Sequence, residues 1–141
     1  MKNNSNLPSK KNSNSIVNES KKTFGPLDML LEGGQKLKDA FISYNTWGVL
    51  NKNRSNAILI CHALTGDQYA AGINPVTKKE GWWNNLIGTD KVLDTNKYFI
   101  VCPNVLGGCM GTTGPSSINK NSKEPYGLNF PVYTIKDMVN M

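Results

Sequence analysis

The stretch Ile58-Leu59-Ile60-Cys61-His62-Ala63-Leu64-Thr65-Gly66-Asp67 joins an apolar run to a short turn. The run has the length and β-branched character of a strand. It lacks polar–apolar alternation, so it predicts a parallel strand buried on both faces. In open α/β sheets, ligands bind beyond the carboxyl ends of the strands. Residues 62–67 would lie there, with backbone N–H groups able to point at a developing negative charge. We therefore expect an α/β fold with a candidate site in this turn.

The segments around this strand predict how the sheet is built. Upstream, residues 27–31 and a longer arm, Lys36 to about Trp47, flank Gly33-Gly34, which is typical of a β-hairpin. Downstream, residues 98–102 are a second candidate for a buried strand. Two strands joined by a crossover of about forty residues resemble a βαβ unit, in which the strands are parallel. The expected order is a β-hairpin followed by parallel strands.

The net charge of +6 is unevenly distributed along the 141 residues. Residues 1–22 contain five lysines and one acid, which places +4 there and +2 in the remaining 119 residues. Because this segment is rich in Asn, Ser and Lys, we expect a disordered basic tail, followed by one folded unit at residues 23–141. A basic tail could bind nucleic acid. No aromatic residue or arginine is interleaved with these lysines, however, which favours a solubilising end and no nucleic-acid partner.

The composition argues against several classes of protein and site. No apolar region of about 7–15 residues follows the first lysines, as it would in a secretory signal, and no stretch approaches the ~18 apolar residues of a membrane span. The three cysteines, Cys61, Cys102 and Cys109, show no C-x-x-C spacing, which disfavours a disulfide framework or a zinc site. These features fit a reducing cytoplasm. We expect no metal, no resident cofactor and no membrane partner.

A long glycine-rich loop follows the second strand candidate, and it contains one possible nucleophile. Gly107-Gly108-Cys109-Met110-Gly111 has the form G-x-C-x-G of a nucleophile elbow, and the only histidine, His62, would have to be the base. An elbow must turn directly into a helix, whereas the next residues, 112–115, cannot begin one cleanly. We therefore disfavour Cys109 as a nucleophile and interpret His62 as a side chain that ties its turn together by hydrogen bonds.

The chain is expected to end in the first turns of a helix. Thr134 has the character of an N-cap, and Asp137 three residues later would reach back to it as in a capping box. The helix would begin at about Ile135.

Taken together, several segments of the sequence resemble the amino-terminal part of the homoserine O-acetyltransferases, which are enzymes of methionine biosynthesis with an α/β-hydrolase fold. The resemblance extends from about Thr23 to Val139. The matching segments, in order, are Cys61-His62-Ala63-Leu64-Thr65-Gly66-Asp67, Gly81-Trp82-Trp83, Leu93-Asp94-Thr95, Asn104-Val105-Leu106-Gly107-Gly108-Cys109-Met110-Gly111-Thr112-Thr113-Gly114-Pro115-Ser116-Ser117, Pro125-Tyr126-Gly127, Phe130-Pro131, and Thr134 with Asp137, Met138 and Val139.

The resemblance implies an acyl transfer in two steps, from acyl-CoA to a serine on an elbow and from that serine to L-homoserine, with a histidine as base and an aspartate that orients it. It also implies that the backbone N–H of Leu64 is one of two oxyanion donors. His62 does not correspond to the catalytic histidine of the family. No G-x-S-x-G is present, so we expect roughly the first third of the enzyme, truncated before the elbow and without the Ser-Asp-His triad.

Several functional interpretations remain open at this stage. The acyl donor could be acetyl-CoA or succinyl-CoA, and the chain could instead be a non-catalytic remnant or the complementing piece of a split acyltransferase. The full-length family implies a homodimer, with L-homoserine and acyl-CoA as small-molecule substrates. Without the strand that would pair with the strand beginning at Ala57, that edge would be unpaired. We therefore expect the chain alone to be marginally stable and inactive.

Overall fold

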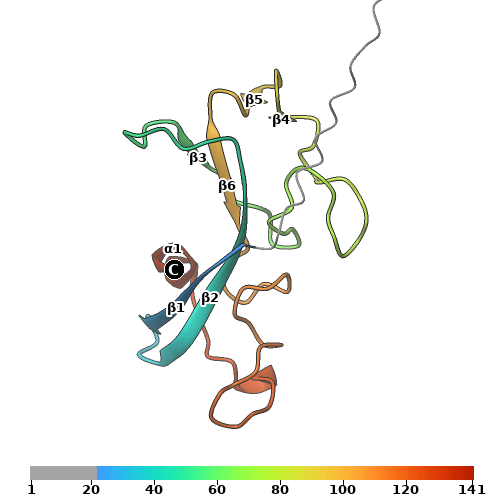
Figure 1. The fold of residues 1–141 in the computed structure, drawn as a ribbon. Helices are drawn as coiled ribbons and strands as arrows, with labels where there is room; N and C mark the ends of the chain where they lie inside the picture. The colour runs from blue at the N-terminus through green and yellow to red at the C-terminus, as the bar shows by residue number, and fades with distance from the viewer. Residues whose placement is uncertain (1–21) are drawn as a thin grey trace, which may run out of the picture.

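The computed structural model describes residues 22–141. Its main feature is a four-stranded sheet in the order β1-β2-β6-β3, formed by β1 (Lys22–Leu30), β2 (Lys36–Trp47), β6 (Phe99–Pro103) and β3 (Ala57–Leu59) (Figure 1). The short strands β4 (Ile87–Gly88) and β5 (Leu93–Asp94) pair separately, and η1 (Gly127–Asn129) and α1 (Ile135–Asn140) follow. The expected tail lies outside the described residues except for Lys22, which is the first residue of β1.

The predicted β-hairpin is confirmed. Strands β1 and β2 are antiparallel, and the turn between them is closed by hydrogen bonds from Leu31 N–H to Gln35 O (2.9 Å) and from Gly34 N–H to Leu31 O (2.8 Å). β1 begins earlier than the apolar run at residue 27, because Lys22 already pairs with Tyr44. Long β2 then reaches past β1 and also pairs with β6, so the hairpin and the parallel strands belong to one sheet.

The predicted parallel pair is also confirmed, but β3 is shorter and less buried than expected. Ala57 pairs with Phe99 and Leu59 with Val101, and beyond the strand the Ile60 N–H still donates to Val101 O at 2.8 Å. Ile60 is 4% exposed, whereas Leu59 is 63% exposed. The expectation that both faces are buried is therefore wrong. β3 is the edge of this sheet, and within residues 22–141 the side chain of Leu59 stays largely uncovered.

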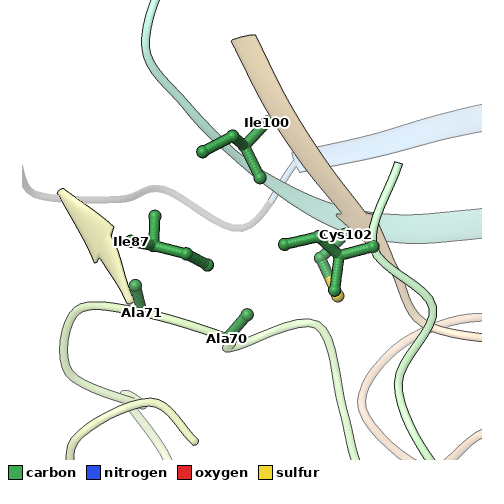
Figure 2. Packing of buried hydrophobic residues seen from close by; sticks show 6 residues of the cluster. Ala70, Ala71, Ile87, Ile100 and Cys102 are labelled. Atoms are coloured by element: carbon green, nitrogen blue, oxygen red, sulfur yellow. The ribbon is translucent and has the colours of Figure 1, made fainter. Parts of the chain in front are cut away.

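The chain between β3 and β6 forms one of two hydrophobic clusters. This crossover contains β4, β5 and successive turns, and its Ala70, Ala71 and Ile87 pack against Ile100 and Cys102 of β6 (Figure 2). Residues 81–88 make turns, one of which is closed by the hydrogen bond from Asn84 N–H to Gly81 O (3.0 Å). No helix within residues 22–141 is long and apolar enough to cross a membrane.

The second cluster joins the hairpin to the end of the chain. Leu31, Leu37 and Ala40 of the hairpin and Leu106 of the long loop are buried together, and the partly buried side chains of Tyr133 and Met138, among others, pack against them. The predicted N-cap is confirmed: Thr134 and Asp137 form a capping box at the start of α1. The loop that follows β6 is therefore held between β2 and the last helix.

Candidate functional site

The turn after β3 presents a free backbone N–H group. The Gly66 N–H donates to Ala63 O at 2.8 Å, which closes a turn with Leu64 and Thr65 at its centre. The Leu64 side chain is 89% exposed, and its N–H has no acceptor within residues 22–141. A Cβ at Gly66 would lie 3.1 Å from the Cβ of His62, so a larger residue would crowd this turn. The Leu64 N–H, which the family resemblance implied to be an oxyanion donor, is thus unpaired within the described residues.

His62 makes hydrogen bonds through both of its ring nitrogens. Nδ1 lies 2.7 Å from Ala63 O, and Nε2 receives the Val105 N–H at 3.2 Å. The side-chain nitrogen of Asn104 also lies 3.2 Å from Nε2. These contacts match the expectation that His62 ties its turn together, and they link that turn to the loop after β6.

Asn104 is the buried centre of that loop. It is 1% exposed, its N–H donates to Ser43 O at 2.8 Å, and its Oδ1 accepts the Met110 N–H at 3.2 Å. The Thr112 hydroxyl donates to Asn104 O at 2.6 Å. Sequence reasoning placed Asn104 in a matching motif but gave it no role, because nothing in a loop without periodicity shows which side chains turn inward.

Asp67 holds the other end of the turn. Its carboxylate accepts the Tyr69 N–H at 2.8 Å and the Asn74 side-chain amide at 2.9 Å, and its carbonyl accepts the indole N–H of Trp82 at 3.0 Å. Trp82 and Trp83 are each 39% exposed and contact one another. Trp82 therefore supports the exit from the turn, and the pair presents apolar surface beside it.

The cysteines do not form a catalytic centre with the histidine. Cys109 is exposed and lies in a bend, and the next helical residues begin only at Gly127, so the elbow geometry is not formed. The hydrogen-bond partners of His62 are Ala63, Asn104 and Val105. Burial raises the pKa of the Cys102 thiol to about 12, and Asp67 and Cys61 act in the same direction. Because the thiolate is the reactive form and little of it is present, Cys102 is unreactive and serves as a packing residue.

Within residues 22–141, the candidate site thus contains an unpaired backbone N–H, that of Leu64, without a nucleophile–base pair beside it. A backbone N–H at the carboxyl end of a strand can stabilise an oxyanion, and it acts together with reacting groups supplied by other parts of a protein. No group of three or more His, Cys, Asp or Glu that could bind a metal ion occurs in the described part of the chain.

Comparison with solved structures identifies the fold to which this sheet and turn belong. A homoserine O-acetyltransferase from Bacillus anthracis aligns with a TM-score of 0.78 and 37% identity, over 86% of this chain and 34% of that protein. Esterase E22 aligns with a TM-score of 0.76 and 34% identity, over 86% of this chain and 35% of that protein. The sheet is the amino-terminal portion of an α/β-hydrolase fold, with the turn at residues 63–66 following β3.

Curated relatives indicate which family of α/β-hydrolase-fold proteins this chain resembles. The homoserine O-acetyltransferase of Methanohalobium evestigatum is 59% identical over 115 residues, which are 82% of this chain and 24% of that protein. The enzyme of Methanococcus vannielii is 54% identical over 128 residues, 90% of this chain and 26% of that protein. No model of a protein family matches the chain. The chain is homologous to the homoserine O-acetyltransferases and spans about a quarter of the length of these two relatives.

Proposed function

We propose that this chain is the amino-terminal part of a homoserine O-acetyltransferase, which transfers the acetyl group of acetyl-CoA to the γ-hydroxyl of L-homoserine in methionine biosynthesis. The observation that carries this proposal is the identity of 54–60% to proteins of that name over most of the chain. The unpaired N–H of Leu64, a residue that is largely exposed, supports it. The cytoplasm is the compartment in which such a reaction would take place, and a homodimer is the assembly proposed for the full-length enzyme.

In this proposal the chain contributes electrostatic stabilisation to the reaction. The Leu64 N–H donates to the oxygen of the tetrahedral intermediate as a serine attacks the thioester and the CoA thiol leaves. It donates again when the homoserine hydroxyl attacks the acyl-serine and the serine is released. The serine, the histidine base and its aspartate would lie outside these 141 residues. The chain supplies one donor but no nucleophile, so the isolated chain is proposed to be inactive.

Hydrolysis is the second candidate, because esterase E22 matches this fold nearly as well as the B. anthracis acetyltransferase does. Both reactions would use the same oxyanion donor and differ only in whether homoserine or water accepts the acyl group. The identity to curated acetyltransferases, 54–60%, is much higher than the 34% identity to the esterase. Acyl transfer is therefore the favoured function.

The role of Leu64 can be tested by removing a single N–H group. Residues 23–141 would replace the matching segment of the M. evestigatum homologue, and CoA release would be followed with and without homoserine. In this chimera Leu64→Pro deletes the amide proton, and proline suits the second position of a turn. We expect kcat to fall by about 10²–10³-fold, the usual effect of losing one oxyanion donor.

Leu64→Ala is the matched control, because it removes the exposed side chain and keeps the N–H. It should retain kcat within a few fold. Equal losses in the two variants would contradict the donor role, and CoA release independent of homoserine would favour hydrolysis. The purified 141-residue chain should show no homoserine-dependent CoA release, and such activity would overturn the proposal that the nucleophile lies elsewhere.

A further inference from the structure

The direction of the Leu64 N–H is set by the carbonyl on the other side of the same peptide bond. Ala63 C=O and Leu64 N–H belong to one peptide unit, which is planar and trans, so the two groups point in opposite directions. Whatever holds Ala63 O in place therefore also aims the Leu64 N–H. Leu64 itself cannot supply this restraint, because its side chain is 89% exposed.

Two donors hold that carbonyl oxygen. The Gly66 N–H lies 2.8 Å from Ala63 O and closes the turn from within. Nδ1 of His62 lies 2.7 Å from the same oxygen and is the donor supplied by a side chain. A turn hydrogen bond alone leaves the turn able to rotate as a unit, whereas the imidazole connects it to another part of the molecule.

The far edge of the His62 ring is attached to the loop after β6. Nε2 faces two donors, the Val105 N–H and the side-chain amide of Asn104, each at 3.2 Å. A second hydrogen bond determines which end of the Asn104 amide faces the ring. Asn104 Oδ1 accepts the Met110 N–H at 3.2 Å, so the side-chain nitrogen of Asn104 must face His62. Asn104 is 1% exposed, so the support for the ring lies in the protein interior.

This pattern selects one tautomer. With two N–H groups directed at Nε2, the proton of the neutral ring must be on Nδ1, where it donates to Ala63 O. The opposite tautomer would place an N–H against two donors and a lone pair against a carbonyl oxygen. The loop after β6 thus determines the proton position that restrains the Ala63–Leu64 peptide.

We infer that His62 is a positioning residue of the reaction. In its Nδ1–H tautomer, the His62 ring donates to Ala63 O, and this hydrogen bond directs the Leu64 N–H at the oxyanion. The inference rests on the proposed role of Leu64 as a donor. His62 takes no proton from a substrate in this scheme. It transmits the rigidity of the buried Asn104 loop to a turn that would otherwise depend on one internal hydrogen bond.

The tautomer of the His62 ring can be determined without an enzyme assay. His62 is the only histidine of the 141 residues, so the chain labelled with ¹⁵N should give one set of imidazole signals in a two-bond ¹H–¹⁵N correlation spectrum. In the neutral ring we expect a protonated Nδ1 and an unprotonated Nε2. Asn104→Ala should shift the signals toward the other tautomer, since it removes one of the two donors to Nε2. A dominant Nε2–H tautomer in the parent chain would overturn the inference.

The catalytic consequence is measured in the chimera described above. His62→Ala should lower kcat by about 10- to 100-fold with little change in KM, because a displaced donor affects the transition state more than the ground state. His62→Asn places an amide nitrogen near the position of Nδ1 and should recover most of this loss. His62→Gln places an oxygen near Nε2 and provides no donor to Ala63 O, so it should not recover it.

A matched control separates aiming from general loop stability. The Asn56 side chain also makes three hydrogen bonds, to Asn51 N–H, Val49 O and Lys97 O, but it lies just before β3, at the end opposite the turn. Asn56→Ala should lower thermal stability without the kcat effect of His62→Ala. Equal kcat losses in the Ala, Asn and Gln variants of His62 would overturn the positioning role. If Leu64→Pro retains full activity, the donor proposal fails instead, and the spectrum still reports whether His62 holds the peptide.

Discussion

Gly48 and Gly34 have nearly the same backbone conformation and very different surroundings. Their φ values are +77° and +80°, which L-residues with side chains rarely adopt. A Cβ at Gly48 would lie 2.0 Å from the carbonyl oxygen of Tyr98 and 2.8 Å from that of Thr95, whereas a Cβ at Gly34 would meet nothing within 4 Å. At Gly48 the chain leaving β2 passes directly against the backbone that leads into β6. Substitutions at Gly34 and Gly48 therefore distinguish the cost of the left-handed backbone conformation, which both share, from the cost of a steric clash, which arises only at Gly48.

Gly34→Ala should lower the free energy of unfolding by about 1–2 kcal/mol, the cost of a left-handed conformation alone. Gly48→Ala adds a collision with backbone atoms that cannot move aside cheaply, so we expect a loss of roughly 4 kcal/mol or more, which is exceptional for one substitution. Urea unfolding followed by circular dichroism measures both. Equal losses in the two variants would contradict the close approach of residue 48 to residue 98.

At the scale of elements, Asp137 joins the start of α1 to the turn of the β1–β2 hairpin. One carboxylate oxygen accepts the Thr134 N–H at 2.9 Å, and the other accepts the Glu32 N–H at 2.9 Å, although Glu32 is 105 residues away in sequence. Burial by itself raises the pKa of Asp137, but the hydrogen bonds from Thr134 and Glu32 together outweigh it, so this pKa lies below its usual value. The six-residue helix α1 thus depends on a charged carboxylate shared with the hairpin.

Asp137→Asn should destabilise the chain at neutral pH, because an asparagine has one oxygen for two backbone donors and would turn its NH₂ group toward the second. A depressed carboxyl pKa contributes stability above the pKa of the unfolded chain, near 4, and that contribution is lost as the pH falls through the folded-state value. The difference in urea midpoint between parent and variant should therefore be large at pH 7 and shrink below about pH 4.

Asp28→Asn is the matched control for this comparison. Asp28 is an acid whose side chain accepts one backbone hydrogen bond, from the Asp39 N–H at 3.0 Å, and an asparagine oxygen can accept it equally well. We expect little change in the urea midpoint of this variant at pH 7. A loss as large as that of Asp137→Asn would show that the second hydrogen bond to Asp137 is not what stabilises α1.

At the scale of the whole molecule, apolar side chains remain uncovered on β3 and α1, among other elements. Leu59 lies on β3, at the edge of the sheet, and is 63% exposed. Ile135 and Val139 of α1 lie four residues apart, hence on one face of the helix, and are 74% and 78% exposed. An edge strand with an exposed apolar side chain is a template for pairing with another chain. We therefore expect the isolated 141-residue chain to associate with itself.

Leu59→Lys should reduce this association several-fold, because a charge on an edge strand blocks edge-to-edge pairing and the exposed position accommodates a long side chain. Light scattering coupled to size exclusion, over a range of protein concentrations, measures the effect. Val76→Lys provides the comparison: Val76 is 69% exposed but lies outside the strands, in a turn of the crossover. If both variants reduce association equally, net charge explains the change and pairing through β3 does not.

The sequence determined the hairpin, the parallel pair, the capped helix and the position of the turn after β3. These features follow from local rules: Gly-Gly between strand-like segments, continuous apolar runs, and Thr134 three residues before Asp137. The resemblance to homoserine O-acetyltransferases, read from the same residues, is supported by the comparisons with curated relatives. Local patterns suffice for the hairpin and the helix cap because each depends on residues close together in the chain. The pairing of Ala57 with Phe99 joins distant residues, and it was predictable because strands linked by a crossover of this kind are parallel.

Only the tertiary structure decided which residues support the turn after β3 and which faces are covered. The contacts of His62 with Asn104 and Val105 join residues more than forty positions apart, and no periodicity of the sequence predicts such contacts. The apolar run that reads as a strand buried on both faces is half exposed, because burial depends on which elements pack against a strand and not on its composition. Hydrophobic pattern is a local property of the chain, whereas coverage and hydrogen-bond partners are properties of the assembled sheet.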